Sequence, residues 1–243
     1  MRRITAGAVA AALAVVATGC AIELDAKEVH AAQAFPFSGT ELTVKSSLGG
    51  LRVLPGTGGS VQVERWVRGK AAADGNATWS LKDGTLRLSA DCTTVFGDCG
   101  ARYHVKVPPG VHLKVDADHD GVILDGLPQD VDVSTSGAIQ VSGTSGRLRL
   151  LGDHASVTGT QIRSEHVRVR TSAGAINLSF AAMPSELDLL SRNGRVTATV
   201  PTGEYGVTVR STYGSEVSQI KSTKSPRTIV AKSTSGDVRI NSR

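Results

Sequence analysis

The sequence predicts an all-β fold, a β-solenoid built as a stack of repeats of about 20 residues, and three observations lead to it. From residue 111 to the end, alternating apolar residues flank short breaks rich in serine, threonine and glycine. The break glycines Gly174, Gly194 and Gly214 are spaced 20 residues apart, and Gly236 follows 22 residues later. No stretch after residue 38 has helical periodicity. A fixed period with strand-type alternation is typical of stacked β units.

The repeated phrase occurs at residues 131–141, 167–178, 187–196, 207–217 and 229–240. A unit of this size cannot bury its apolar side alone, so it must stack on its neighbours. We expect each break glycine to adopt a positive φ that lets the chain turn a corner. The unit at 148–157 differs because Gly152 comes early, which predicts an irregular corner. A β-sandwich of hairpins would give the same local alternation and is the alternative.

Strands are also predicted before the repeats. Alternating residues indicate strands at 42–44, 51–53 and 61–66. Residues 79–88 read as a hairpin whose tight turn is Asp83-Gly84. The strand at 103–107 ends at Pro108-Pro109-Gly110, where no ladder hydrogen bond is needed.

Residues 1–19 have the pattern of a lipoprotein signal peptide. Arg2 and Arg3 form the basic start, residues 4–16 are apolar, and small residues lead to Cys20. A cysteine directly after Gly19 indicates cleavage before Cys20 and lipidation of its thiol and new amino group, palmitate being one such acyl chain. This predicts a lipid-anchored protein on the extracytoplasmic face of the cell membrane. An ordinary secretory signal with a free Cys20 is the alternative.

The remaining chain divides at about residue 39. Residues 20–38 are expected to be a lipidated N-terminus and tether, with a short amphipathic helix as one form, and residues 39–243 a single domain. The net charge is +5 for the whole chain, and residues 127–243 hold 14 Lys/Arg against 9 Asp/Glu. This mild basic bias suits a wall polymer, a glycan, anionic lipid or envelope proteins as partners, and nucleic acid is not expected outside the cytoplasm.

Two cysteines remain beside Cys20. Cys92 and Cys99 leave an even number of cysteines in a chain that is expected outside the cytoplasm, which predicts a disulfide between them. A zinc site is the weaker alternative, because two thiols alone leave the coordination of zinc incomplete.

The chain resembles the bacterial putative-adhesin family of surface proteins, also called adhesin-like β-helix domains. Two phrases carry the resemblance besides the repeats: Tyr-x-Val-x-Val-Pro-x-Gly at residues 103–110 and Val-Pro-x-x-x-Tyr, whose matching residues are Val200, Pro201 and Tyr205. The resemblance spans residues 40–243 and implies a right-handed β-helix-like fold at the cell surface. It implies no catalytic residues.

One break carries more charge than a turn requires. Asp116, Asp118 and Asp120 alternate and are followed by Gly121, which places oxygen ligands of the kind that Ca²⁺ binds on one tight loop. The pattern departs from an EF-hand, since position twelve is Leu127 and no helices flank the loop. A calcium site here is a hypothesis, and a solvated acidic corner is the alternative. No other cofactor is expected.

Histidines at two breaks are a second candidate. His119 with Asp120, and His154 with Asp153, would form a metal or acid–base pair if the corners stack. Isolated surface histidines are the alternative reading.

The chain lacks a nucleophile elbow, a P-loop, a His-Glu-x-x-His motif and a dinucleotide fingerprint. The aspartates at 116, 118 and 120 and the stripe Arg147, Arg149, Arg168 and Arg170 are the only material for a polysaccharide-active enzyme on a β-helix scaffold. The sequence therefore favours a non-catalytic binding or scaffolding module at the cell envelope. Such an enzyme, or a structural or stress-sensing envelope protein, is the alternative.

Overall fold

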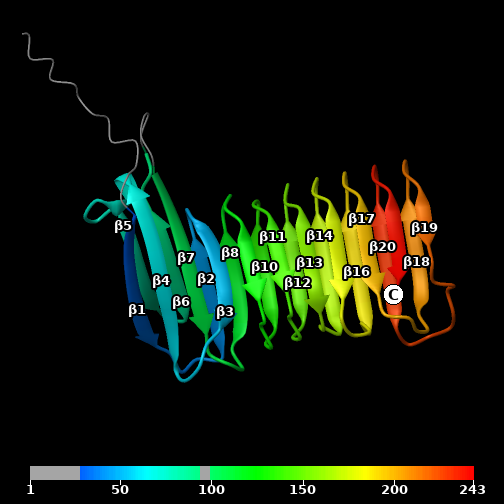
Figure 1. Ribbon diagram of the computed structural model, residues 1–243, viewed down its shortest axis with the longest axis horizontal. Helices are drawn as coiled ribbons and strands as arrows, with labels where there is room; N and C mark the ends of the chain where they lie inside the picture. Colours follow the sequence, from blue (N-terminus) through cyan, green and yellow to red (C-terminus); the bar gives the residue numbers. More distant parts are fainter. Residues whose placement is uncertain (1–27, 94–98) are drawn as a thin grey trace, which may run out of the picture.

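The computed structural model describes residues 28–93 and 99–243, which form two β-sheets facing each other across one hydrophobic core (Figure 1). Sheet 1 contains, in spatial order, β1 (Val29–Pro36), β4 (Ser60–Gly69), β7 (Cys99–Val107), β3 (Gly50–Pro55), β9 (Val122–Asp125), β11 (Ile139–Ser142), β13 (Val157–Ile162), β15 (Ile176–Phe180), β17 (Val196–Val200), β21 (Val238–Ser242) and β19 (Glu216–Ser218). Sheet 2 contains β18 (Gly206–Ser211), β20 (Thr228–Ser233), β16 (Glu186–Ser191), β14 (His166–Thr171), β12 (Leu148–Gly152), β10 (Val131–Thr135), β8 (His112–Ala117), β2 (Glu41–Ser46), β6 (Thr85–Ala90) and β5 (Ala77–Lys82). A single 3₁₀ turn, η1 (Lys70–Ala72), follows β4.

From β8 to β17, consecutive strands lie in opposite sheets, and each strand pairs in parallel with the strand two positions away in the chain. We call a strand of sheet 2 together with the sheet 1 strand that follows it a rung. Val131, Leu148, Val167 and Leu187 are register partners on four consecutive rungs, 17, 19 and 20 residues apart. The period of about 20 residues is therefore the length of chain in one rung.

Alternation decides which side chains enter the core. Leu150, Val169 and Leu189 point inward from neighbouring strands and have no exposed surface. Burying each such side chain contributes about 1.5–3 kcal/mol relative to leaving it in water. The all-β prediction is confirmed, with two mixed sheets, and this layering also fits the β-sandwich alternative.

The N-terminal end of both sheets is antiparallel. β1 pairs with β4 and β4 with β7 in sheet 1, while β5 and β6 form a hairpin at the edge of sheet 2. Asp83 and Gly84 form its turn with φ of 48° and 72°, so the predicted Asp-Gly hairpin is confirmed. Within the described residues, no helix is both long and apolar enough to cross a lipid bilayer.

The ordered domain begins earlier than the boundary predicted at residue 39. Residues 29–36, expected to belong to a tether or a short helix, form β1 at the edge of sheet 1. Phe35 is the only residue of β1 that is buried, so this strand has almost no alternating apolar pattern for the sequence to reveal. The remainder of the predicted tether up to residue 27, and the predicted signal peptide, lie outside the described residues.

The break glycines stack on one another, for a reason other than the one predicted. The glycines with positive φ are elsewhere among the described residues, for example Gly126 and Gly143. A Cβ added to Gly174 would instead overlap the carbonyl group of Ala155, and one added to Gly194 would overlap that of Gly174. Glycine is needed at these corners because consecutive rungs approach each other too closely for a side chain.

The hydroxyl residues of the breaks bind the same corners together. Thr171 Oγ1 accepts the N–H of Gly174 at 3.0 Å and donates to the carbonyl oxygen of Ala155 on the preceding rung at 2.9 Å. Ser233 makes the equivalent two hydrogen bonds, from the N–H of Gly236 and to the carbonyl of Gly194, each at 2.9 Å. These serines and threonines are therefore structural, since each joins its own corner to the next.

At the corner around Gly152, two positions have residue types that differ from those of the neighbouring corners, and one change makes room for the other. Gly152 is in register with Thr135 and Thr171, so it stands where neighbouring rungs have a hydroxyl residue. Ala155 stands where later rungs have glycine, because its carbonyl accepts the hydrogen bond from Thr171. A Cβ on Gly152 would lie 2.7 Å from the Cβ of Ala155, so the missing side chain at 152 makes room for the methyl group at 155.

The last two rungs are exchanged relative to their order in the chain. β20 and β21 lie between the rung β16–β17 and the rung β18–β19, although β18 and β19 come earlier in the sequence (Figure 1). The glycine stack follows the spatial order, since a Cβ on Gly236 would meet Gly194 and a Cβ on Gly214 would meet Gly236.

We predict that Gly174→Ala destabilises the protein by about 3 kcal/mol, because the new methyl group must push two rungs apart. The midpoint of urea unfolding measures this change. Gly50→Ala is the matched control, since a Cβ there meets nothing within 4 Å and the change should stay within about 0.5 kcal/mol. Equal midpoints for the two variants would contradict the close-approach explanation.

The exchange at Gly152 and Ala155 predicts a coupled pair of substitutions. Gly152→Thr alone should cost roughly 1–3 kcal/mol, because its Cβ collides with Ala155. Adding Ala155→Gly should recover at least half of that loss and restore the Thr-to-Gly arrangement of the neighbouring corner. A double-mutant cycle in urea measures the coupling, and strictly additive effects would rule out the compensation.

Candidate functional site

The outer face of sheet 2 carries charged side chains in register on successive strands. Outward positions fall between the buried ones, so parallel pairing aligns them in rows. The first row is Lys114, Asp132, Arg149, Arg168 and Asp188, and the second is Asp116, Ser134, Leu151, Arg170 and Leu190. The outer face of sheet 1 differs over four strands, where the aligned row is the uncharged set Gln140, Thr158, Asn177 and Thr197.

A depression of about 1050 Å³ lies on this face, and we call it the arginine groove. Its charged and histidine lining is Arg147, Arg149, Arg163, Arg168, His112, His166, Asp130, Asp132, Glu165 and Glu186. Arg149 and Arg168 are direct register partners on β12 and β14. The structure thus brings three arginines of the predicted stripe, Arg147, Arg149 and Arg168, into one groove.

Ion pairs hold part of this lining in place. Asp130 accepts the backbone N–H and a guanidinium N–H of Arg147, each at 2.8 Å. These contacts, the backbone N–H foremost, lower the pKa of the Asp130 carboxyl. Asp188 forms ion pairs with two arginines, with Arg168 at 3.3 Å and with Arg170 at 2.6 Å. Asp130 and Asp188 therefore neutralise arginines of this face.

A second depression, of about 610 Å³, lies at the corners after these strands. It brings together Asp118, His119 and Asp153, from two corners that are far apart in the sequence. His154 lies 3.1 Å from Asp153 and is largely exposed. The two corners are not direct neighbours, because the corner of Thr135 and Ser136 lies between them: the Ser136 N–H donates to the Asp118 carbonyl, and the Asp153 N–H donates to the Thr135 carbonyl. The histidine–aspartate pair therefore stays a prediction, and Asp120 has another partner.

Two of the three aspartates of the acidic corner have partners on other strands or turns. Asp116 pairs with Lys45 at 3.4 Å, and Asp120 accepts the N–H of Gly49 at 2.6 Å. Within the described residues, no group of three His, Cys, Asp or Glu side chains is arranged to hold a metal ion. The calcium site remains a hypothesis, which a calorimetric Ca²⁺ titration of the wild-type chain and of Asp118→Asn tests.

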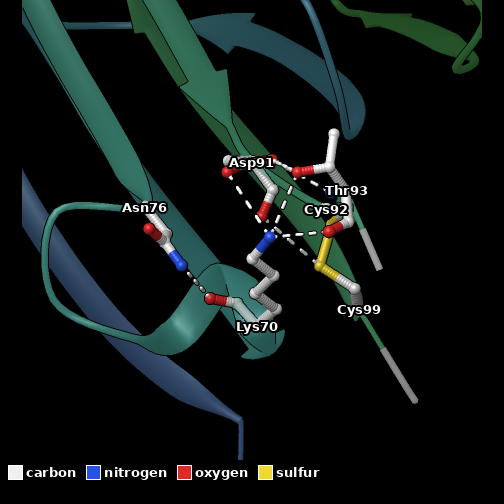
Figure 2. Close-up of polar contacts among 6 residues, drawn as sticks. All are labelled: Lys70, Asn76, Asp91, Cys92, Thr93 and Cys99. Atoms are coloured by element: carbon white, nitrogen blue, oxygen red, sulfur yellow. Dashed lines mark hydrogen bonds and ion pairs between the residues drawn. A yellow bond between two sulfur atoms is a disulfide. The ribbon is translucent and has the colours of Figure 1, made fainter. Parts of the chain in front are cut away.

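The disulfide between Cys92 and Cys99 is present, with a Cα–Cα distance of 5.6 Å (Figure 2). Lys70 reaches from η1 to this segment, donating to the Thr93 carbonyl at 2.7 Å and lying 3.7 Å from Asp91. Figure 2 shows these groups converging beside the sulfur atoms. The arrangement is a structural clamp at the N-terminal end of the domain. Cys20 lies outside the described residues.

An aromatic cluster on the outer face of sheet 1 escaped the sequence analysis. His30 stacks on Trp66 at 4.7 Å, and the Arg102 guanidinium lies 4.8 Å from the centre of the same ring. Burial and the nearby Arg52 and Arg102 lower the pKa of His104, which meets Trp66 edge-on. The alternation of 61–66 places Trp66 outward, but its partners come from other strands and have no local signal.

Comparisons with known proteins give structural neighbours only. No family model and no curated protein matches the chain. A putative adhesin from Bacteroides fragilis is 14% identical, with a TM-score of 0.49, over 88% of this chain and 97% of that one. A putative cell adhesion protein from Clostridium sporogenes is 10% identical, with a TM-score of 0.40, over 89% and 100%. Proteins described as adhesins are thus among the structural neighbours.

Proposed function

We propose that this chain is a lipid-anchored, non-catalytic binding module on the extracytoplasmic face of the cell envelope. Residues 1–19 act as the signal peptide, and Cys20 carries the acyl chains that hold the module on the membrane. Residues 112–243 form a two-sided β-solenoid, and the parallel pairing of strands from successive rungs supports this description. The disulfide between Cys92 and Cys99 fits an oxidising location outside the cytoplasm.

The observation that carries the proposal is the set of in-register rows on the outer face of sheet 2. Each rung repeats the same two outward positions at the strand spacing of about 4.8 Å, which presents a long and regular surface. A regular surface of this kind matches an extended ligand that itself repeats.

The chemistry of the groove favours binding over catalysis. A general acid in a glycan-cleaving enzyme needs a raised pKa. Asp130 has a lowered pKa because Arg147 donates to it, and Asp188 is shared by two arginines. These carboxylates are suited to hold arginine side chains in position.

The proposal also implies a position for the binding face relative to the anchor. Glu28 is the eighth residue after Cys20, so the link is at most about 28 Å long. β1 lies at one end of the stack, and β18 and β19 lie at the other (Figure 1). In this proposal the antiparallel end stays near the membrane, and the groove, on β8 to β16, lies farther along the stack.

We predict that Cys20→Ala abolishes palmitate labelling and releases the protein from membranes. Metabolic labelling followed by fractionation measures both effects. The double variant Cys92→Ala/Cys99→Ala is the control for cysteine loss and should keep its label. Membrane retention of Cys20→Ala with unchanged labelling would contradict the anchor.

The soluble Cys20→Ala chain then tests the binding function directly. Incubated with wall, lipid and envelope-protein extracts, it should retain one class of component reproducibly. Retention of nothing from any of the three extracts would count against a binding module.

A further inference from the structure

The arginine groove contains cations that the protein itself does not neutralise. Arg147 is paired with Asp130, and Arg168 lies 3.3 Å from Asp188 and 3.8 Å from Glu186. Arg149 and Arg163 have no ion pair or side-chain hydrogen bond with any residue in the described ranges 28–93 and 99–243. Both side chains are exposed and line the groove.

The register partners of Arg149 distinguish it from an ordinary surface charge. Its register partner on one side is Arg168, on an adjacent strand, and neighbouring strands lie about 4.8 Å apart. Its partner on the other side is Asp132, whose carboxylate lies 3.3 Å from His112. The nearest aligned acid is therefore held by another residue, and Arg149 faces a neighbour of the same charge.

An anion from outside would supply the partner that Arg149 lacks among the described residues. A guanidinium binds carboxylate and phosphate through two parallel hydrogen bonds, which suits these two anions above others. Each contact at an exposed site is weak, so a single small anion would bind poorly. A chain that carries one acidic group per unit can reach Arg163 at the rim and Arg149 on the strand together, and multivalency then adds the weak contacts.

We propose that the arginine groove binds a linear polyanion with repeated carboxylate or phosphate groups, and that Arg149 and Arg163 are its main contacts. This inference rests on the proposed binding function and names the ligand class. Arg147 and Arg168 line the site, and their carboxylate partners orient them.

The test uses the soluble Cys20→Ala chain and three probes of similar length: a polyuronate, a poly(glycerol phosphate) and an uncharged glucan. Isothermal titration calorimetry should give binding to at least one of the acidic polymers and none to the glucan. Raising the salt concentration should weaken that binding, because the contacts are exposed charges. The acidic polymer that binds more tightly identifies the ligand as a carboxylate or a phosphate chain.

The double variant Arg149→Glu/Arg163→Glu should lower the affinity at least tenfold. The matched control is Arg87→Glu/Arg239→Glu, which makes the same charge change at two exposed arginines outside the groove and should alter the affinity less than twofold. Thermal unfolding of both variants verifies that they are folded. An equal loss in the control, equal binding to the glucan, or equally tight binding to double-stranded DNA would overturn the proposal, since each indicates nonspecific attraction.

The two proposals can fail separately. Retention of an envelope component by the soluble chain without affinity for either acidic polymer would refute the groove assignment and leave the binding module standing. Binding of a polyanion that depends on Arg149 and Arg163, without retention of any envelope component, would support the groove and refute the envelope function.

Discussion

The close approach of consecutive corners is the contact on which the rest of the structure depends. Strands of one sheet must lie about 4.8 Å apart for their ladder hydrogen bonds, so the corners that join the sheets must stack at the same spacing. At Gly174 the backbone comes so near to the carbonyl of Ala155 that no Cβ fits, and the hydroxyl of Thr171 binds the two corners together. Where Ala155 breaks this pattern, Gly152 has lost its side chain to make room. The small polar residues of the breaks therefore allow the corners to stack at the spacing that the strand ladders require.

Fixed corners in turn fix which side chains reach the surface. A slip of one residue in any rung would exchange its inner and outer faces, so the stacked corners hold the register that puts Arg149 beside Arg168. The two outer faces then differ in chemistry although they are built from the same rungs. Over four strands the aligned row of sheet 1 holds amides and hydroxyls, whereas that of sheet 2 holds two acids and two arginines. Because the backbone is repetitive, the choice of outward residue alone distinguishes a charged face from a neutral one.

Local pattern was sufficient to predict the strands, the Asp83-Gly84 turn, the pairing of Cys92 with Cys99 and the arginine stripe, since each depends on residues close in sequence. Alternation could not give the edge strand β1, which buries only Phe35, or the reason for the corner glycines, which lies in the rung beside each of them. It also missed the exchange of the last rungs, although burial explains it. Ile229, Ala231, Val238 and Ile240 have no exposed surface and need a rung on both sides, whereas all three residues of β19 are exposed and suit the end of the stack.

The two ends of the stack explain why a side face is the better place for a ligand. At the N-terminal end the sheets finish in antiparallel strands, and Arg65 covers Trp79 at 4.3 Å while donating to the carbonyl of Ala77. At the other end β18 is an edge strand, where free N–H groups would invite pairing with another chain. Ser222 accepts the N–H of Val207, and Glu216 accepts that of Ser211, so side chains of the protein itself already occupy two of these donors. Part of the β18 edge is therefore already occupied, whereas the side of the stack offers charged groups without a partner among the described residues. The exposed and unneutralised Arg149 and Arg163 lie there, and a ligand long enough to follow the rungs gains contacts with each rung that it crosses.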